Sequence, residues 1–116
     1  MAEARYTSFR EFWPYYLREH ARSSTRALHY IGTTLVVVLL IAAIATRIWW
    51  LAAAIPVAGY GFAWAGHAFA ERNRPATFTY PSWSLIADFL MWWLWLTGRI
   101  EPELVAAGVK PAQRTA

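Results

Sequence analysis

The chain has 116 residues, of which 58% are hydrophobic and 16% charged, and its formal net charge is +4. Soluble globular domains contain about 45–50% apolar residues, so this composition favours a protein largely surrounded by lipid. The chain contains no cysteine, which excludes disulfides and cysteine-based zinc or redox sites. Its arginines are dispersed around apolar segments rather than clustered, so we expect no nucleic-acid partner.

The first predicted element is an amphipathic helix over residues 8–21 that lies in the headgroup region of a membrane. Ser8 and Glu11 have the spacing of a capping box at its start. We expect its apolar face to enter the lipid and its charged face to remain in water. This apolar face consists of Phe9, Phe12, Trp13, Tyr16 and Leu17.

Two spanning helices are predicted next, over residues 27–47 and 49–71. The first contains an uncharged run over residues 31–46, long enough for about 24 Å of helix. The second begins almost at once, so the two form an antiparallel pair joined by a tight turn around Arg47. Pro56 is expected to kink the second helix. The N-cap oxygens of the first are expected from Ser23, Ser24 and Thr25.

A polar connection over residues 71–81 precedes the third predicted span, residues 82–97. Ser82 is the expected N-cap of this helix, and Gly98 is its expected C-terminal stop. The polar tail, residues 98–116, contains a short helix at most. The predicted fold is therefore an all-α, polytopic membrane bundle of three spans plus one interfacial helix, forming a single domain over residues 1–116.

The distribution of arginines predicts the orientation of this bundle. Five arginines lie before the first span and two in the connection over residues 71–81, whereas the turn between the first two spans has only Arg47. The positive-inside rule places the N-terminus and the later connection in the cytoplasm. We therefore expect a multi-pass integral membrane protein, in the bacterial inner membrane if the protein is prokaryotic, with its site on the cytoplasmic side.

The unusual polar residues His20, His29, His67, Glu71 and Asp88 fall near this same side of the bilayer. Helical rise places His29, His67 and Asp88 within about 5–10 Å of the cytoplasmic edge. Helical spacing also defines two stripes on the second span. One consists of Tyr60, Trp64, His67 and Glu71, and the other, whose small residues permit close approach by a neighbouring helix, of Gly59, Ala63, Gly66 and Ala70.

Ionisable residues at membrane depth usually face a bundle interior and carry a function. One interpretation is that His20, His29 and His67 bind one metal ion, with Glu71 or Asp88 as a further ligand or as a hydrogen-bond partner of a ligand. Imidazole and carboxylate suit iron, zinc or manganese. A haem held by His29 and His67 is an alternative. The plainest alternative is that Asp88 pairs with a buried arginine or caps a backbone group, and that the histidines are interfacial and hydrogen-bonded.

The segments FREFWPYYLREHARSSTRALHYIGT and GYGFAWAGHAFAERNRPATFTYPSWSLIADF resemble the signature regions of a family of small membrane proteins. This family is related to the fungal 2-hydroxy fatty acid dioxygenase. The resemblance covers residues 9–88, and its most specific part is the AWxGHxxxExNxPAT-like stretch over residues 63–77. It implies an Fe(II)-dependent enzyme of fatty acid α-oxidation, which uses O2 to convert a 2-hydroxy fatty acid into a fatty acid one carbon shorter. The family's histidines match His20, His29 and His67.

The function expected from this resemblance is a non-haem iron dioxygenase, with His20, His29, His67, Glu71 and Asp88 as catalytic residues and Fe(II) as cofactor. The alternative is a non-catalytic membrane protein, such as a b-haem carrier or an assembly scaffold. A cation beside the site would hold the substrate carboxylate, although headgroup contact is an equal alternative for the arginines. The candidate substrate-binding residues are Arg72, Asn73, Arg74 and Trp64. Whether the chain forms a homo-oligomer is not specified by the sequence.

Overall fold

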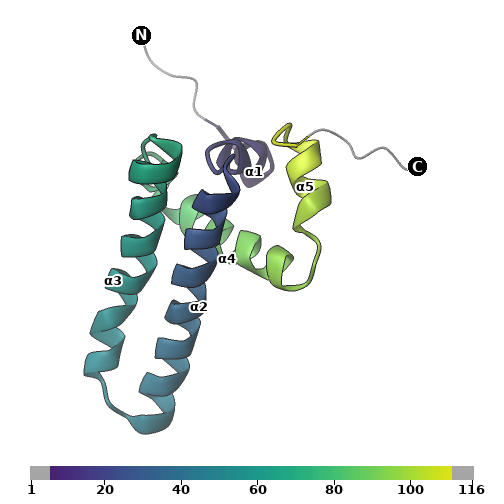
Figure 1. Cartoon of the computed structure of the whole chain (residues 1–116). Coiled ribbons are helices and arrows are strands. Elements are labelled where there is room, and N and C mark those ends of the chain that lie inside the picture. The colour runs from purple at the N-terminus through teal and green to yellow at the C-terminus, as the bar shows by residue number, and fades with distance from the viewer. Residues whose placement is uncertain (1–5, 111–116) are drawn as a thin grey trace. The chain divides into compact units, whose positions relative to one another are not determined.

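The protein is described by a computed structural model that places residues 6–110, and every regular element in this range is a helix (Figure 1). The all-α prediction is confirmed. The contacts divide the chain into two compact units, Met1–Ala21 with Ala76–Ala116, and Arg22–Pro75. The prediction of a single domain over the whole chain stays a prediction, and each unit is described by itself below.

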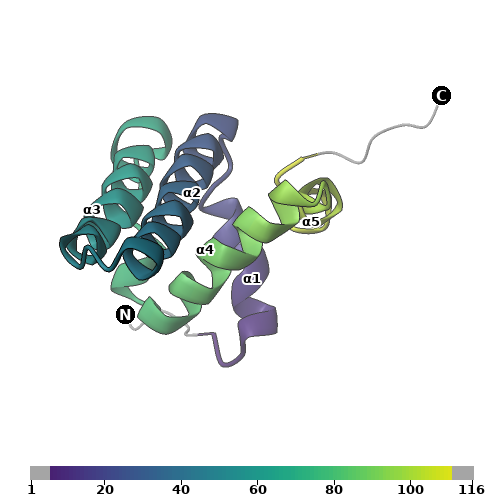
Figure 2. The same cartoon turned by 90° about the horizontal axis from the view of Figure 1, so that it is seen from below.

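The first unit contains α1 (Phe9–Arg18), the short 3-10 turn η2 (Ala76–Phe78), α4 (Pro81–Leu96) and α5 (Ile100–Ala106). Helix α1 lies against both α4 and α5 (Figure 2). The Phe12 ring joins α1 to the start of α4, with ring centroids 5.1 Å from Tyr80 and 5.6 Å from Trp83. This unit is therefore held together by aromatic packing between segments far apart in the sequence.

Helix α1 begins as predicted but buries its apolar face differently. The Ser8 side chain accepts a hydrogen bond from the Glu11 N–H, which confirms one half of the capping box. Phe12, Tyr16 and Leu17, which we expected to face lipid, are at most 1% exposed. The prediction was wrong for these three side chains because partners elsewhere in the chain cover them.

The two ends of α4 differ in how well the sequence predicted them. Ser82 does not cap this helix, because the helix begins one residue earlier at Pro81, whose fixed φ and missing N–H suit the first turn. At the other end Gly98 has a φ of +73°. The Arg99 N–H donates to the Leu94 carbonyl, and the Gly98 N–H donates to Trp95, completing a Schellman motif. The predicted stop at Gly98 is confirmed.

The tail prediction is tested only in part. Helix α5 occupies seven residues after Gly98, as expected for a short helix at most. Residues 111–116 of the predicted polar tail lie outside the described range.

The second unit is a hairpin of α2 (Ser23–Thr46) and α3 (Trp50–Ala65), which lie side by side and are followed by a π-helical turn, η1 (Gly66–Glu71). The N-cap of α2 is Arg22, with no side-chain cap, so the predicted capping by Ser23, Ser24 or Thr25 was wrong. Arg47 ends α2 in the left-handed conformation, with a φ of 59°. The predicted antiparallel pair with a tight turn is confirmed.

Small residues let the two arms of the hairpin approach each other closely. An added Cβ at Gly59 would lie 3.1 Å from Val36 Cγ2, and one at Gly66 would lie 3.3 Å from Thr25 Cγ2. From the other arm, a Cβ at Gly32 would lie 3.0 Å from the Phe62 Cβ. Two glycines of the predicted small-residue stripe thus face α2, as that stripe requires.

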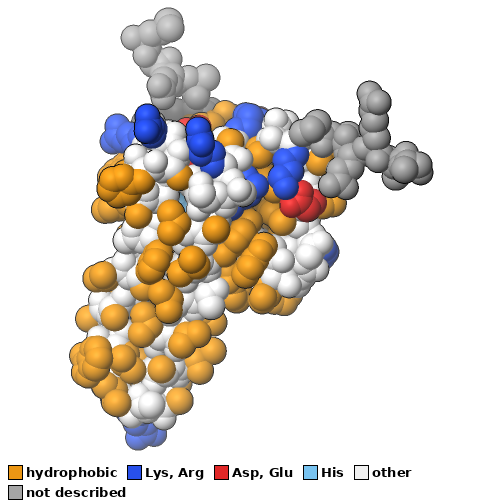
Figure 3. All heavy atoms as spheres, viewed as in Figure 1, with side chains coloured by type: hydrophobic (Ala, Val, Ile, Leu, Met, Phe, Trp, Pro, Cys, Tyr) orange, Lys and Arg blue, Asp and Glu red, His pale blue; other side chains and the backbone are white. Residues whose placement is uncertain are grey.

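The outer surface of this hairpin is strongly apolar (Figure 3). Within residues 6–110, α2 is the one helix that is both long and apolar enough to cross a membrane. Helices α3 and α4 each have 16 residues, so the prediction of three spanning helices is not confirmed. The large exposed apolar residues of the hairpin include Ile41, Ile44, Trp49, Trp50 and Val57, each more than 60% exposed.

Candidate metal centre

Two of the predicted site residues meet inside the second unit. His29 lies in the second turn of α2, and His67 is the second residue of η1. Both are buried, at 5% and 2% exposure, and their ring centroids are 5.3 Å apart with the planes at 86°. The close approach of Gly66 to Thr25 brings the two segments together at this level. The hairpin therefore pairs two imidazoles in its interior.

A reversal of the chain after η1 fixes the position of His67. Arg72 has a left-handed φ of 59°, and its N–H donates to the His67 carbonyl. The Asn73 N–H donates to the same carbonyl at 2.9 Å. The side-chain oxygen of Asn73 then lies 2.6 Å from His67 Nδ1. Both the backbone and the ring of His67 are thus held by the residues that follow the π turn.

His20 belongs to the first unit, just after the end of α1. Its N–H donates to the Leu17 carbonyl at 3.0 Å, and its Nδ1 lies 2.6 Å from the Tyr16 carbonyl oxygen. The Tyr16 ring covers the imidazole, with centroids 4.2 Å apart. His20 is 1% exposed.

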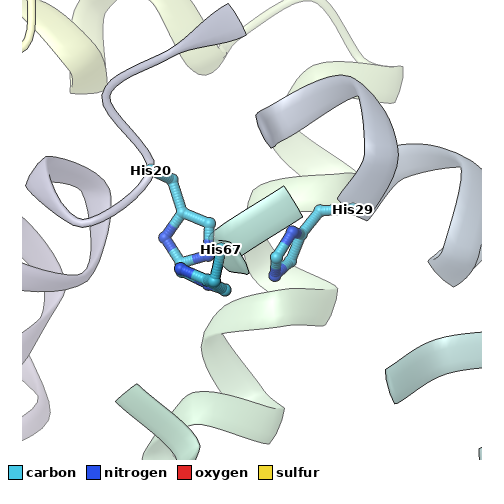
Figure 4. Close-up of side chains that lie close together, drawn as sticks. All are labelled: His20, His29 and His67. Carbon is cyan, nitrogen blue, oxygen red and sulfur yellow. The ribbon is translucent and has the colours of Figure 1, made fainter. Parts of the chain in front are cut away.

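The three buried histidines lie close together and could hold a metal ion (Figure 4). Each offers one ring nitrogen, and these nitrogens lie within 4.8 Å of one another. They come from the end of α1, from α2 and from η1. The predicted grouping of His20, His29 and His67 is therefore present.

The three rings share one pattern of hydrogen bonding. In each, Nδ1 faces an oxygen, supplied by the Tyr16 carbonyl at 2.6 Å, the Thr25 carbonyl at 3.3 Å and the Asn73 amide at 2.6 Å. A carbonyl oxygen only accepts, so a neutral ring bonded to it carries its proton on Nδ1 and its lone pair on Nε2. Metal-bound histidines commonly donate their other N–H in this way. This arrangement suits three imidazoles that bind a metal through Nε2.

The two predicted carboxylates have other partners within their own units. Glu71 accepts a hydrogen bond from the backbone N–H of Arg22. Asp88 accepts one from the Tyr16 hydroxyl. Tyr16 thus links Asp88 to the His20 environment, since its own carbonyl faces the His20 ring. The catalytic roles of Glu71 and Asp88 stay predictions.

The candidate substrate-binding residues differ in their exposure and in their contacts. Arg72 and Arg74 are exposed, and Trp64, 42% exposed, packs against Tyr60 with ring centroids 5.4 Å apart. Asn73 is the residue that contacts a histidine directly. Their roles in substrate binding stay predictions.

Sequence reasoning missed three residues near the histidines. Tyr16 and Thr25 act through their backbone carbonyls, each four residues before the histidine it contacts, and any residue type supplies a carbonyl. Arg26, one of the five arginines from which the orientation was predicted, is only 5% exposed and lies one turn before His29. An arginine three residues before a histidine, at the start of an apolar run, was the one available signal.

The fold and this cluster define an all-helical protein with a buried, three-histidine candidate metal centre and an apolar hairpin. Residues 6–100 match the family described as 2-hydroxy-palmitic acid dioxygenase Mpo1-like, so the chain belongs to that family. The family expected from the sequence resemblance is thereby confirmed. No curated protein and no solved structure matches the chain.

Proposed function

We propose that this protein is an Fe(II)-dependent dioxygenase that shortens 2-hydroxy fatty acids by one carbon. The observation that carries the proposal is the buried group His20, His29 and His67, with ring nitrogens within 4.8 Å of one another, in a chain of this family. Imidazole is a suitable ligand for iron, and three protein ligands leave positions for other ligands on a six-coordinate ion. When bound, Fe(II) supplies the electrons with which O2 is first activated.

The proposed overall reaction balances with one O2 and no further reductant. A 2-hydroxy fatty acid and O2 give the shorter fatty acid, CO2 and water, with cleavage of the C1–C2 bond. C2 rises from an alcohol to a carboxylic acid, which releases three electrons, and C1 rises from carboxyl to CO2, which releases one. These four electrons reduce O2 completely, so a co-substrate such as a 2-oxo acid is unnecessary.

The residues of the chain have three tasks in this reaction. The Nδ1 contacts hold the imidazoles in one orientation, which lowers the cost of arranging the ligands. Burial of His20, His29 and His67 keeps bulk water from the reacting atoms. A cation beside the cluster would bind the substrate carboxylate, and we propose Arg72 or Arg74 for this task, with Trp64 beside them.

The apolar hairpin suits a substrate dissolved in lipid. Ile41, Ile44, Trp50 and Val57 are 62–74% exposed, and exposing such side chains to water is unfavourable. We propose that the hairpin enters a bilayer, that α4 completes a multi-pass protein, and that the site faces the cytoplasm. A cysteine introduced at Thr79, which is exposed in the connection before α4, should then react with a membrane-impermeant label only from the cytoplasmic side, and labelling only from outside would contradict this orientation.

The grouping of three histidines favours this function over a b-haem carrier. A haem carrier of this type uses two histidine ligands. His20, His29 and His67 together offer three ring nitrogens within 4.8 Å of one another. A haem held by His29 and His67 would leave His20 without a role.

The direct experiment measures metal and turnover on purified protein in detergent. We expect one non-haem iron per chain and O2 consumption with 2-hydroxypalmitate that yields pentadecanoate, but none with palmitate. His67→Ala should abolish both, whereas Ser24→Ala, an exposed change in the same unit, should retain both. A Soret band, or full turnover by His67→Ala, would overturn the proposal.

A further inference from the structure

We propose that Asn73 is a positioning residue for the metal centre, because its amide oxygen selects the ring form in which His67 presents Nε2 to a metal ion. This inference rests on the metal site of the proposed function, but not on the reaction carried out there. It assigns Asn73 a task different from substrate binding. The contact that carries it is the 2.6 Å distance between Asn73 Oδ1 and His67 Nδ1.

His67 differs from the other two histidines in the origin of this contact. His20 and His29 each face the carbonyl four residues earlier, which their own helices supply. The corresponding carbonyl for His67 is that of Ala63, but His67 lies in the π turn over Gly66–Glu71, which changes the regular relation between a side chain and the carbonyl four residues earlier. His67 therefore takes its acceptor from a side chain beyond η1, and that side chain belongs to Asn73.

The backbone holds Asn73 in place for this task. The N–H groups of both Arg72 and Asn73 donate to the His67 carbonyl. Arg72 adopts the left-handed conformation, which turns the chain back toward η1. Asn73 is thus joined to His67 through its backbone as well as its side chain. A residue held in this way is better suited to orienting the His67 ring than to binding a substrate.

The ring form decides whether His67 is a ligand. Neutral imidazole in water favours the proton on Nε2, which would occupy the nitrogen needed for the metal. A buried acceptor at Nδ1 reverses this preference, because leaving a buried N–H without an acceptor costs about 1–3 kcal/mol. Partners of metal-bound histidines typically change metal affinity by about 10–100-fold when removed. Asn73 should therefore change the affinity of the protein for the metal ion even when no substrate is bound.

The test reads the ring form directly in the metal-free full chain in detergent micelles. The chain has three histidines, so a long-range 1H–15N spectrum at pH 8 contains three imidazole systems. We expect the proton of His67 on Nδ1 in the unaltered protein. In Asn73→Leu, which keeps the branched shape but removes the acceptor, we expect the His67 proton mainly on Nε2, with His20 and His29 unchanged.

Cobalt(II) titration of the same samples gives the second readout, through the visible absorption of the bound ion. Asn73→Leu should weaken Co(II) binding about 10–100-fold. Asn73→Asp, which keeps an acceptor, should retain the Nδ1 proton and bind Co(II) at least as tightly as the unaltered protein. Ser24→Ala should behave like the unaltered protein in both measurements.

Each result decides the inference without reference to turnover. An Nε2 proton on His67 in the unaltered protein would overturn it even if Asn73→Leu failed to fold. Unchanged Co(II) affinity in a folded Asn73→Leu would also overturn it. If Asn73 orients His67 as proposed but the loaded protein does not consume O2 with 2-hydroxypalmitate, the dioxygenase function alone is rejected.

Discussion

The carboxylate of Glu71, at the end of the π turn, accepts a hydrogen bond from the backbone N–H of Arg22, the N-cap residue of α2. Helix α2 has no side-chain cap of its own. Glu71 therefore satisfies a donor at this N-terminus and places a negative charge where the helix dipole favours one. It also ties the segment carrying His67 to the helix carrying His29.

Replacing Glu71 separates these two contributions. Glu71→Ala should destabilise the protein by about 1–2 kcal/mol, because it removes both the acceptor and the charge. Glu71→Gln keeps an acceptor, so its loss of stability should be less than half of that in Glu71→Ala. Thermal or denaturant unfolding in detergent measures both changes. Equal effects of the two substitutions would contradict a capping role.

The close contact between Gly66 and Thr25 predicts opposite effects for two glycine substitutions in one hairpin. In Gly66→Ala the new Cβ would lie 3.3 Å from Thr25 Cγ2 and 3.4 Å from the Thr25 carbonyl oxygen, so η1 must move away from α2. We expect a loss of about 1 kcal/mol in stability, as for modest overpacking, and weaker Co(II) binding because His29 and His67 separate.

Gly61→Ala is the matched control for that substitution. Gly61 lies within α3, and an added Cβ there meets nothing within 4 Å. Alanine in a helix interior should raise stability by about 0.5–1 kcal/mol and leave Co(II) binding unchanged. If both alanines had the same effect, the contact between Gly66 and Thr25 would not control the spacing of the histidines.

Burial raises the pKa of the Tyr15 hydroxyl to about 12, with a further contribution from the negative charge of Glu19. The folded state therefore keeps the Tyr15 proton where the unfolded chain begins to lose it, near its ordinary value of 10.0. Stability supported by this group should be present below pH 10 and be lost as the pH rises toward 12. The free energy of unfolding, measured from pH 10 to pH 12, should fall less steeply with pH in Tyr15→Phe than in the unaltered protein. The same slope in both proteins would contradict a contribution from Tyr15.

The sequence predicted the hairpin because it follows from regular helix, and it predicted the histidine grouping from the expected depth of the histidines and from the resemblance to the family. The long apolar runs, the single Arg47 between them and the glycines at helical spacing determine how α2 and α3 pair. The stop at Gly98 was equally predictable, since glycine readily adopts the positive φ that ends α4 there.

Departures from regular helix were not predictable. Helical spacing placed His67 and Glu71 on one face, but the π turn over Gly66–Glu71 widens the helix and changes that register. The following left-handed residue is Arg72, whose side chain gives no sign of that conformation. The link between Asn73 and His67 depends on both features, so spacing alone identified Asn73 as near the site but not as the partner of a ligand.

At Thr25, one substitution can test stability and function separately. Its hydroxyl is fully buried and has no hydrogen-bond partner within the described structure, while its backbone carbonyl faces the His29 ring. Thr25→Val keeps the shape and the carbonyl but removes the hydroxyl. Removing a buried, unpartnered hydroxyl should stabilise the protein by about 1 kcal/mol, because its desolvation cost disappears.

If that hydroxyl has no ligand in the working protein, turnover with 2-hydroxypalmitate should be unchanged in Thr25→Val. If instead it donates to the substrate, KM should rise although stability rises as well, because the substituted protein lacks one donor for the bound acid. Ser24→Ala is the control, since Ser24 neighbours Thr25 in α2 but is exposed. We expect Thr25→Val to raise KM and Ser24→Ala to leave it unchanged. A Thr25→Val protein that is less stable than the original would contradict the burial argument itself.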